Sequence, residues 1–296
     1  MKTHSYIHLA SLPTTNYQFN DYLLFLFFAC MRLSAFLFLL LLVGCDFEPE
    51  GINLDVATWN IRYDNPSDPY RWEDRKKWVA YDLEKFPVVG LQEVLPHQLE
   101  DLNELMPDHE FVGAGRDNGI NEGEICAIGY DTRRITLSGW QTHWLSETPL
   151  DTGTVGWNAA LPRVFTYASI LDSSQVIHVI NTHFDHLGEE ARIESANQIV
   201  AFCERFPVEE PVLVMGDLNA ELNSKPYNIL QESRLGDTYY RNTPRTTFTG
   251  FRGEHDKCID YIFQDGFWVV KAGVSASQSD SLYISDHSLV YTTVKH

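Results

Sequence analysis

The chain has 296 residues, of which 44% are hydrophobic and 13% aromatic, so it can bury a sizeable core and lacks the composition of a disordered protein. Its formal net charge is −19, and its longest basic run is Arg75-Lys76-Lys77. Nonspecific binding to nucleic acid depends on Lys and Arg neutralising phosphates, so this composition disfavours a nucleic-acid partner. The five cysteines show no spacing typical of a zinc site or a disulfide framework.

The amino terminus is the first distinct segment of the chain. Residues 33–43 form an apolar run of signal-peptide length that follows Arg32 and ends in small residues before Cys45. The stretch LVGC that ends at Cys45 resembles the lipobox of bacterial lipoproteins, in which the cysteine is lipidated and becomes the first mature residue. We therefore predict an export segment over residues 1–44, a short tether over 45–53, and a protein anchored through Cys45 in the bacterial cell envelope, on its periplasmic or outer surface face.

Two alternatives for this segment stay open. The stretch from Leu23 to Val43 contains only one charge and is long enough to form an uncleaved transmembrane anchor. Met31 begins a signal of ordinary form, so a start at Met31 is the alternative to an unusually long leader. Under each of these interpretations, the rest of the chain is a soluble domain tethered to a membrane.

The remainder of the sequence predicts one α/β domain over residues 54–296, because no repeat, low-complexity stretch or charge block divides it. Three residues are too few for a helical crossover, so the strands on both sides of Asp172-Ser173-Ser174 should pair antiparallel and make the sheets mixed. Hydrophobic periodicity predicts strands at 54–60, 88–94, 125–130, 164–171, 175–183, 211–217 and 288–294, and helices at 72–86, 96–105 and 189–206.

Carboxylate, amide and imidazole side chains stand at the ends of several predicted strands. Strand ends gather along one rim of a sheet, where active sites are commonly built, so these side chains are candidates for an active site. In chain order they are Asn60, Glu93, His183, Asp217, Asn219, Asp260, Asp286 and His287.

Asp217 and Asn219 form the most informative pair among these candidates. They are two residues apart, so on an extended backbone both side chains point the same way. A carboxylate beside an amide suits the activation of a water molecule, and a divalent cation nearby can neutralise charge. Glu93 is the candidate metal ligand, since Mg²⁺ is usually bound by one or two carboxylates together with water and substrate oxygens.

The histidines could donate hydrogen bonds or protons to phosphoryl oxygens. His183 and His287 are the candidates for this role, and Asp260 could orient one of the two imidazoles. Taken singly, however, an acidic residue at a strand end is more often a turn or cap residue than a ligand. His178 lies inside a predicted strand, and we assign it a structural role.

The order of six short motifs along the chain favours a functional role for these residues over a role in turns or caps. WN, LQE, NTH, GDLN, IDY and SDH, from about Leu54 to Val294, resemble in sequence order the motif set of the endonuclease/exonuclease/phosphatase superfamily, which has the deoxyribonuclease I-like fold. The resemblance implies a four-layer α/β sandwich, in which two mixed β-sheets pack face to face with helices on the outside. It also implies an active site at one end of the sheets.

The family roles transfer motif by motif. In such enzymes the residue matching Glu93 binds the metal, with those matching Asn60 and Asp286 nearby. Asp217 matches the general base for the attacking water, and Asn219 matches the residue that positions this water and the phosphate. The implied metal is Mg²⁺, with Mn²⁺ as an alternative.

The three remaining candidates complete the implied mechanism. His183 and His287 match the pair that stabilises the pentavalent transition state, and Asp260 matches the carboxylate that supports a histidine. The implied reaction is in-line hydrolysis of a phosphate ester. Other stretches of the chain resemble a bacterial subgroup, and four residues are candidate substrate contacts on that basis, although packing or a salt bridge explains them equally well; these are Arg116, Trp144, Trp157 and Asn158.

Several functions remain compatible with the sequence. The acidic composition and the export signal favour a monomeric phosphodiesterase or phosphomonoesterase that acts on a small phosphorylated substrate outside the cytoplasm. An exported nuclease and a noncatalytic surface-binding module are the alternatives, and the membrane anchor leaves a lipid phosphodiesterase resembling sphingomyelinases open.

Overall fold

The structure is a computed structural model that describes residues 51–239, 245–251, 257–275, 278–279 and 282–296. The predicted export segment, Cys45 and most of the predicted tether lie outside these residues, so the division into residues 1–44, 45–53 and 54–296 stays a prediction. None of the helices in the described ranges combines the length and the apolar composition needed to cross a bilayer.

Two six-stranded mixed sheets form the centre of the fold. Each contains one parallel pair, β1 with β2 in the first sheet and β7 with β8 in the second, and otherwise antiparallel neighbours. The first sheet, in the order β11-β14-β1-β2-β4-β3, comprises β1 (Asn53–Asn60), β2 (Val88–Val94), β3 (His109–Val112), β4 (Ile125–Asp131), β11 (Trp268–Ser275) and β14 (Leu289–Lys295).

The second sheet has the order β5-β6-β7-β8-β10-β9. Its β6 and β7 pair antiparallel, as their short connection predicts. Its strands are β5 (Ile135–Trp144), β6 (Val164–Asp172), β7 (Gln175–His183), β8 (Val212–Asp217), β9 (Gly236–Asp237) and β10 (Asp260–Asp265), and a separate two-stranded ribbon joins β12 (Gln278–Ser279) to β13 (Leu282–Tyr283).

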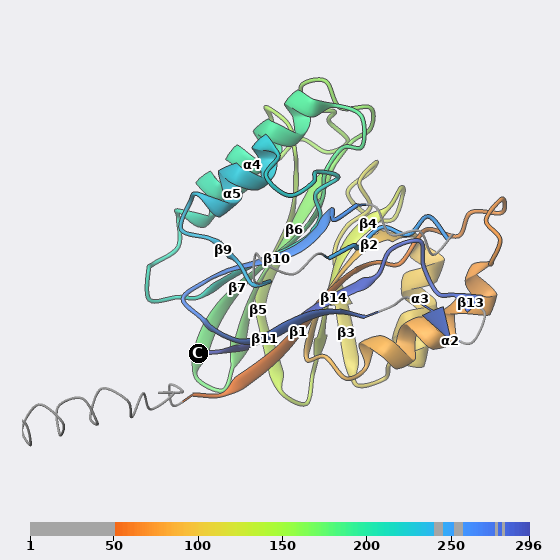
Figure 1. Cartoon of the computed structure of the whole chain (residues 1–296), viewed down its shortest axis with the longest axis horizontal. Coiled ribbons are helices and arrows are strands. Elements are labelled where there is room, and N and C mark those ends of the chain that lie inside the picture. The colour runs from red at the N-terminus through yellow and green to blue at the C-terminus, as the bar shows by residue number, and fades with distance from the viewer. Residues whose placement is uncertain (1–50, 240–244, 252–256, 276–277, 280–281) are drawn as a thin grey trace, which may run out of the picture. The chain divides into compact units, whose positions relative to one another are not determined.

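Alternation along the strands sorts the core into three layers of apolar side chains. On β1, Val56 points between the two sheets, whereas Ala57 points to the outer face. That outer face packs against α2 (Trp72–Leu83) and α3 (Pro96–Leu105), and the outer face of the second sheet packs against α4 (Glu189–Cys203) and α5 (Lys225–Gln231). Figure 1 shows the helix pairs on opposite sides of the sheets. The predicted four-layer sandwich is therefore confirmed.

Some predicted element ends are wrong, and some elements carry no clear pattern. The first and third predicted helices continue to Phe86 and Phe206, but α2 ends at Leu83 and α4 at Cys203. Pro87 directly follows Phe86, and Pro207 directly follows Phe206. A proline disfavours helical backbone in the residue before it, so neither helix continues to its predicted end. β5 was not predicted, because its middle residues are mostly exposed at the sheet edge and do not alternate. The sequence patterns also leave out the strands β3, β9, β10, β11, β12 and β13 and the helix α5.

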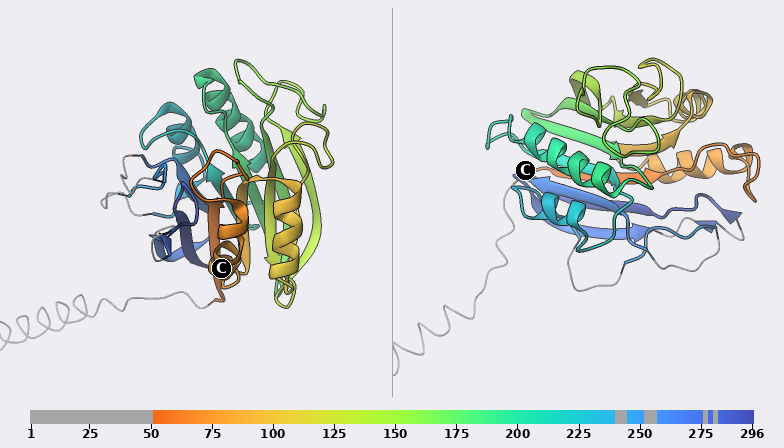
Figure 2. Two further views of the ribbon diagram at one scale, coloured as in Figure 1. Left: turned by 90° about the vertical axis from the view of Figure 1, so that its right-hand side faces the viewer. Right: turned by 90° about the horizontal axis from the view of Figure 1, so that it is seen from above.

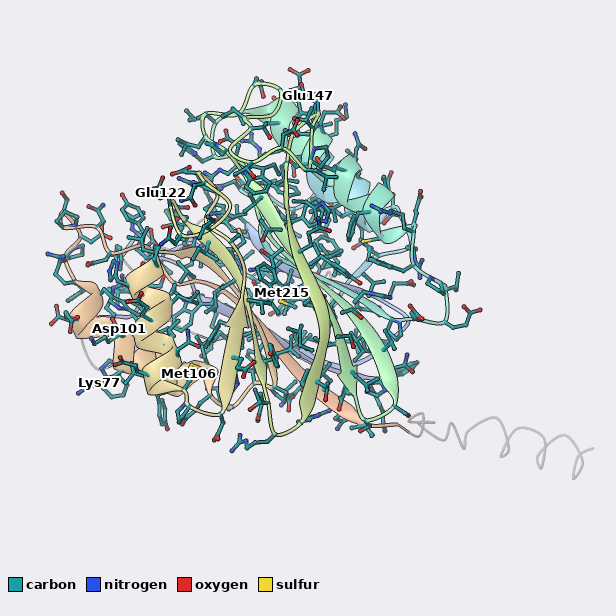
Figure 3. The ribbon with its side chains drawn as sticks, turned by 180° about the vertical axis from the view of Figure 1, so that it is seen from behind. Lys77, Asp101, Met106, Glu122, Glu147 and Met215 are labelled. Atoms are coloured by element: carbon teal, nitrogen blue, oxygen red, sulfur yellow. The ribbon has the colours of Figure 1, made fainter. Side chains whose placement is uncertain are left out.

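A buried polar network joins the two sheets next to the residues that carry the candidate site. Asn181 of β7 donates from Nδ2 to the carbonyl oxygens of Leu91 and Ala127, both at 2.8 Å, and its Oδ1 accepts a bond from Gln92 Nε2 at 2.6 Å. Met215 lies between the sheets (Figure 3). Because these buried bonds span both sheets, they fix β2 and β7 relative to each other.

Candidate active site

A cavity of about 910 Å³ opens at one end of the two sheets. Six of the eight residues predicted from the strand ends line it: Glu93, His183, Asp217, Asn219, Asp286 and His287. The other two, Asn60 and Asp260, are fully buried and contact these lining residues. All eight therefore belong to one cluster, although they come from segments that are far apart in the chain.

Strand register brings three of these side chains together. Asp217, the last residue of β8, lies opposite His183 of β7 and opposite Asp260 of β10. Gly216 has φ +141°, and a Cβ at this position would lie 2.0 Å from the carbonyl oxygen of Thr182. Only glycine fits this approach between β7 and β8, so the glycine of the GDLN motif permits the placement of Asp217.

Glu93 is placed by an irregularity in β2. The pairing of β2 with β4 shifts register between Leu91 and Val94, and Glu93 has φ +59°, which is rare for a residue with a Cβ. Its carboxylate accepts hydrogen bonds from Asn60 Nδ2 at 3.0 Å and from the Tyr63 amide at 3.2 Å. Strained backbone of this kind is typical of functional sites.

Asp217 lies at the centre of the cluster. Its Oδ2 accepts a hydrogen bond from Asn60 Nδ2 at 3.1 Å, and its Oδ1 accepts one from the Asn219 amide at 2.8 Å. The same Oδ2 lies 3.6 Å from His183 Nε2 and 3.8 Å from His287 Nε2. Burial and the neighbouring Asp260 carboxylate raise the pKa of Asp217 to about 7. A carboxylate with this pKa can accept a proton near neutral pH.

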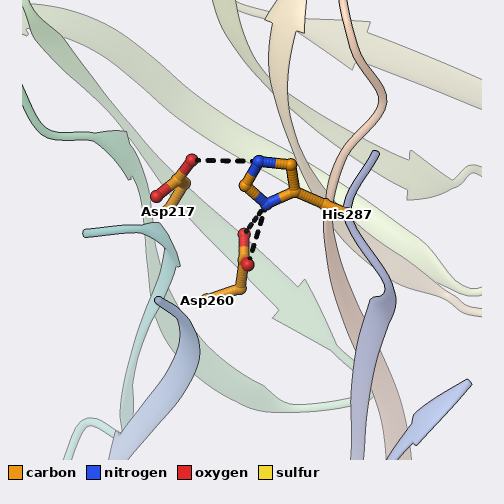
Figure 4. Close-up of side chains that lie close together, drawn as sticks. All are labelled: Asp217, Asp260 and His287. Atoms are coloured by element: carbon orange, nitrogen blue, oxygen red, sulfur yellow. Dashed lines mark hydrogen bonds and ion pairs between the residues drawn. The ribbon is translucent and has the colours of Figure 1, made fainter. Parts of the chain in front are cut away.

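His287 is held by Asp260 (Figure 4). Its Nδ1 donates to both carboxylate oxygens of Asp260, at 3.1 and 2.9 Å, which directs Nε2 towards Asp217. Burial alone would lower the pKa of His287, but Asp260 and then Asp217 raise it well above the usual value. His287 is therefore an imidazolium that can stabilise negative charge or release a proton.

His183 has the opposite character. Burial, together with the guanidinium groups of Arg163 and Arg116, lowers its pKa well below the usual value, so the ring is neutral. Asn219 Nδ2 lies 3.1 Å from His183 Nε2 and can only donate, so Nε2 is the acceptor and Nδ1 carries the proton. The Nδ1 atom lies 3.8 Å from Glu124 Oε2. The two histidines that flank Asp217 thus differ in protonation.

The oxygen donors at the edge of the cluster fit a divalent cation. Glu93 and Asp286 face a common point, because Arg62 Nη1 lies 3.7 Å from an oxygen of each carboxylate. Carboxylate oxygens beside a cavity open to water and substrate are the donor set that Mg²⁺ and Mn²⁺ prefer. Asn60 bridges this pair to the base by donating from Nδ2 to both Glu93 and Asp217.

A second group of potential metal ligands lies deeper. Ligand atoms of Asp217, Asp260 and His287 all lie within 4.8 Å of one another. To bind a cation through Nδ1, however, His287 would have to give up its hydrogen bonds to Asp260. The carboxylates of Glu93 and Asp286 require no such loss and are the more suitable ligands.

The structure explains three of the four additional candidates without a substrate. Trp144 is buried and donates from Nε1 to the Arg116 carbonyl at 2.7 Å. Asn158 Oδ1 accepts the Ala191 amide at 2.9 Å and so caps the first turn of α4 from a distant loop. Trp157 packs partly buried against the core of the second sheet and does not line the cavity. Arg116 does line it, in an ion pair with Glu124 at 2.7 Å.

Sequence reasoning missed eight charged residues of the cavity lining, and three of them lie near the ends of predicted strands. Arg62 lies two residues after the WN motif, Glu124 directly precedes β4 and Arg163 directly precedes β6, so each lies near the end of a predicted strand. Burial and the Glu93 carboxylate raise the pKa of Glu124, against the opposing effect of Arg116 and Arg163. Their position at strand ends was the available signal, but charged residues occur at many strand ends that form no site.

The sequence model of the endonuclease/exonuclease/phosphatase family matches residues 57–287. The chain belongs to this family. Its members are hydrolases of phosphate esters and generally depend on a divalent metal, which agrees with the oxygen-rich donor set beside Glu93. No curated protein sequence matches the chain.

Solved structures of the family resemble the chain along the described sandwich. A family member from Bacteroides vulgatus is 32% identical, with a TM-score of 0.78, and the match covers 82% of this chain and 99% of that one. A mannosyl-6-phosphatase from Bacteroides thetaiotaomicron is 30% identical, with a TM-score of 0.75 and coverage of 82% and 100%. The human Nocturnin catalytic domain, 18% identical with a TM-score of 0.66 and coverage of 83% and 96%, shares the fold.

Proposed function

We propose that this protein hydrolyses a phosphate ester of a small molecule by in-line attack of a water molecule, with Mg²⁺ bound beside Glu93. The observation that carries the proposal is the position of Asp217, whose Oδ2 lies 3.6 Å from His183 and 3.8 Å from His287. A base with a pKa of about 7, between one neutral and one protonated imidazole, suits proton transfer from water and stabilisation of phosphoryl charge.

Each residue has a distinct part in this proposal. Asp217 accepts the proton of the attacking water, and Asn219 holds His183 and the phosphate in position. His287, supported by Asp260, stabilises the leaving oxygen. Glu93 and Asp286 would bind the cation, which supplies charge neutralisation and orientation of the phosphate oxygens. Manganese is the first alternative metal, since the same oxygen donors suit it.

The charge distribution supports a small phosphorylated substrate over a nucleic acid. The whole chain has 22 basic and 41 acidic residues, yet its cavity lining contains six of each kind. Cations are thus concentrated where one phosphate would bind, while the acidic remainder would repel a long polyanion. The basic lining residues are Arg62, Arg116, Arg163, Arg192, Lys225 and Lys257.

A phosphomonoester of a sugar is the first substrate to test. The mannosyl-6-phosphatase that is 30% identical to this chain supports this choice, because the match covers all of that protein. An exported nuclease remains the second candidate, and the family match supports it without favouring it. The filled catalytic positions argue against a noncatalytic binding module.

The test is a metal-controlled substrate screen with the full-length protein. Chelator-treated enzyme is assayed with added Mg²⁺ or Mn²⁺ against hexose phosphates, phosphodiesters, DNA, RNA and phospholipids. We expect metal-dependent release of phosphate from a small ester and a loss of at least about 100-fold in Asp217→Asn. Asp151→Asn, a change on the exposed surface, serves as the matched control. Equal rates in wild type and Asp217→Asn would exclude the proposed mechanism.

We also propose that the enzyme is a monomer, exported and anchored through Cys45. The support for export and for the anchor is the apolar run before the LVGC stretch. Metabolic labelling with a radioactive fatty acid should mark the wild type, and Cys45→Ser should abolish the label. Labelling that persists in Cys45→Ser would contradict the anchor.

A further inference from the structure

The cavity continues beyond the catalytic residues along α4 and α5. These two helices lie side by side on the same face of the second sheet (Figure 2). The segment before α4 and its first turn contribute one side of this extension, and the start of α5 contributes the other. We call this surface the α4/α5 wall, and it consists of His186, Glu189, Arg192, Glu221 and Lys225.

His186 presents a hydrogen-bond donor on this wall. Arg163 Nη2 lies 3.1 Å from His186 Nδ1, and a guanidinium nitrogen can only donate, so Nδ1 is the acceptor. The imidazole is therefore neutral, and its proton is on Nε2. The ring is about half exposed at the cavity, whereas Arg163 is buried. Arg163 thus fixes both the orientation and the tautomer of His186.

The remaining side chains of the wall offer further donors and acceptors. Arg192 donates from Nη1 to the Asp185 carbonyl oxygen at 2.9 Å. This bond fixes the guanidinium and leaves its other N–H groups available to a ligand. Glu189, Glu221 and Lys225 are exposed and make no side-chain hydrogen bond or ion pair with any other residue that the structure describes.

The charge of the wall selects the kind of group that it can bind. Two cations and two carboxylates cancel, and His186 is neutral, so the wall as a whole has no net charge. A second phosphate would face both carboxylates, and a nucleobase would find a single aromatic ring on the wall for stacking, the imidazole that Arg163 holds. Hydroxyl groups both donate and accept, so a polyol can pair with the donors and the carboxylates together.

We propose that the α4/α5 wall is the leaving-group subsite and binds a neutral, hydroxyl-rich group such as the sugar part of a phosphomonoester. This inference rests on the proposed function. Water adds its oxygen to phosphorus, the ester P–O bond breaks, and the leaving oxygen takes a proton. The products are inorganic phosphate and the free polyol, and the wall contacts only the latter.

The test compares two monoesters that share the phosphate and differ in the leaving group. Glucose 6-phosphate and mannose 6-phosphate carry a polyol, whereas p-nitrophenyl phosphate carries an aromatic ring without further hydroxyl groups. In the full-length enzyme with Mg²⁺, Arg192→Gln and Glu189→Gln should each raise KM for the hexose phosphate about 5- to 10-fold, the effect of about one lost hydrogen bond. For p-nitrophenyl phosphate, kcat/KM should change less than twofold.

A matched control exists next to the wall. Glu190 is exposed and adjacent to Glu189, but it does not line the cavity, so Glu190→Gln should leave both substrates unaffected. Equal losses on both substrates would overturn the subsite, since they would place the defect at the phosphate. Unchanged hexose-phosphate kinetics in both wall variants, or a stronger effect on AMP than on the hexose phosphates, would also overturn it.

Failure of the proposed function gives a different result. Wild type that hydrolyses no ester under any metal condition would disprove the proposed catalysis. The kinetic comparison of the two monoesters could then not be made. In that case, calorimetric titration with glucose 6-phosphate decides the subsite alone: binding that weakens in Arg192→Gln but not in Glu190→Gln supports it, and absence of binding in wild type overturns it.

Discussion

His287 donates from Nδ1 to both carboxylate oxygens of Asp260, at 3.1 and 2.9 Å, although the two residues come from different sheets of the sandwich. Asp260 belongs to β10 of the second sheet, and His287 stands just before β14 of the first. The bond therefore joins the sheets beside the cavity and fixes an orientation in which Nε2 faces Asp217. Asp260 is fully buried and lies outside the cavity lining.

Asp260→Asn should reduce kcat about 100- to 10,000-fold and leave KM nearly unchanged. The amide keeps the size of the side chain, but the loss of its charge lowers the pKa of His287 and weakens the positive charge near the leaving oxygen. Steady-state kinetics of the single variants and of the double variant with His287→Gln provide the check. Because the two residues act as a unit, the double variant should be no worse than His287→Gln alone; independent, multiplying losses would contradict the pairing.

Glu93→Gln should raise the concentration of Mg²⁺ needed for half-maximal activity by about tenfold or more, because a neutral amide replaces a ligand carboxylate. Metal binding also stabilises the folded state, so added Mg²⁺ should raise the Tm of wild type more than that of the variant. Glu104→Gln, on the exposed side of α3, is the control. A variant whose Tm responds to Mg²⁺ as wild type does would place the cation elsewhere.

Asp185→Asn should lower the free energy of unfolding at pH 7 by about 2–3 kcal/mol. The buried carboxylate accepts the amides of Gly188 at 2.7 Å, Leu187 at 2.9 Å and Ala160 at 3.1 Å. Burial alone would raise the pKa of Asp185, but these bonds lower it below the usual value of 3.8. A lowered pKa means that the stabilisation is present above pH 3.8 and is lost as the pH falls through the folded-state pKa.

Urea unfolding at several pH values measures this effect. The difference between wild type and Asp185→Asn should be largest near pH 7 and shrink below the usual aspartate pKa. The exposed Asp151→Asn should show no such trend. A difference that stays constant down to the lowest pH at which the protein folds would mean that the charge of Asp185 does not contribute.

Asn181→Val should lower the free energy of unfolding by about 3 kcal/mol, because it removes three buried hydrogen bonds, one from Gln92 Nε2 and two to carbonyl oxygens, and Gln92 Nε2 keeps only its bonds to Thr58 and Gly90. For a domain of this size the Tm should fall by about 6–12 °C, which thermal unfolding followed by circular dichroism can measure. The exposed Asn197→Val, on α4, is the control for the loss of a surface amide. A fall of less than about 2 °C would show that the network contributes little to the pairing of the sheets.

The predictable parts of the fold are those whose local pattern agrees with their final environment. The central strands β1, β2, β7 and β8 are mostly buried on both faces and appear in the sequence as short runs rich in apolar residues. The edge strand β5 does not, since solvent covers part of it and its residues need not alternate. Order along the chain, rather than any single motif, indicated the catalytic set.

Other features of the site had no local signal. Glu124 and Arg163 reach the cavity only because β4 and β6 begin there, and Asn158 caps α4 across a long loop. The protonation states of His183 and His287 could not be predicted from the sequence either. Desolvation and neighbouring charges set their pKa values, and both depend on three-dimensional packing.

By itself, the sequence determined the acidic composition, the alternation of strands and helices, and the set of candidate side chains for the chemistry. Only the tertiary structure decided which of them meet, which imidazole is charged, and which neutral wall extends the cavity. The reason is physical: hydrophobic periodicity is a local property of the chain, whereas register, burial and electrostatic potential arise from contacts between segments that are distant in sequence.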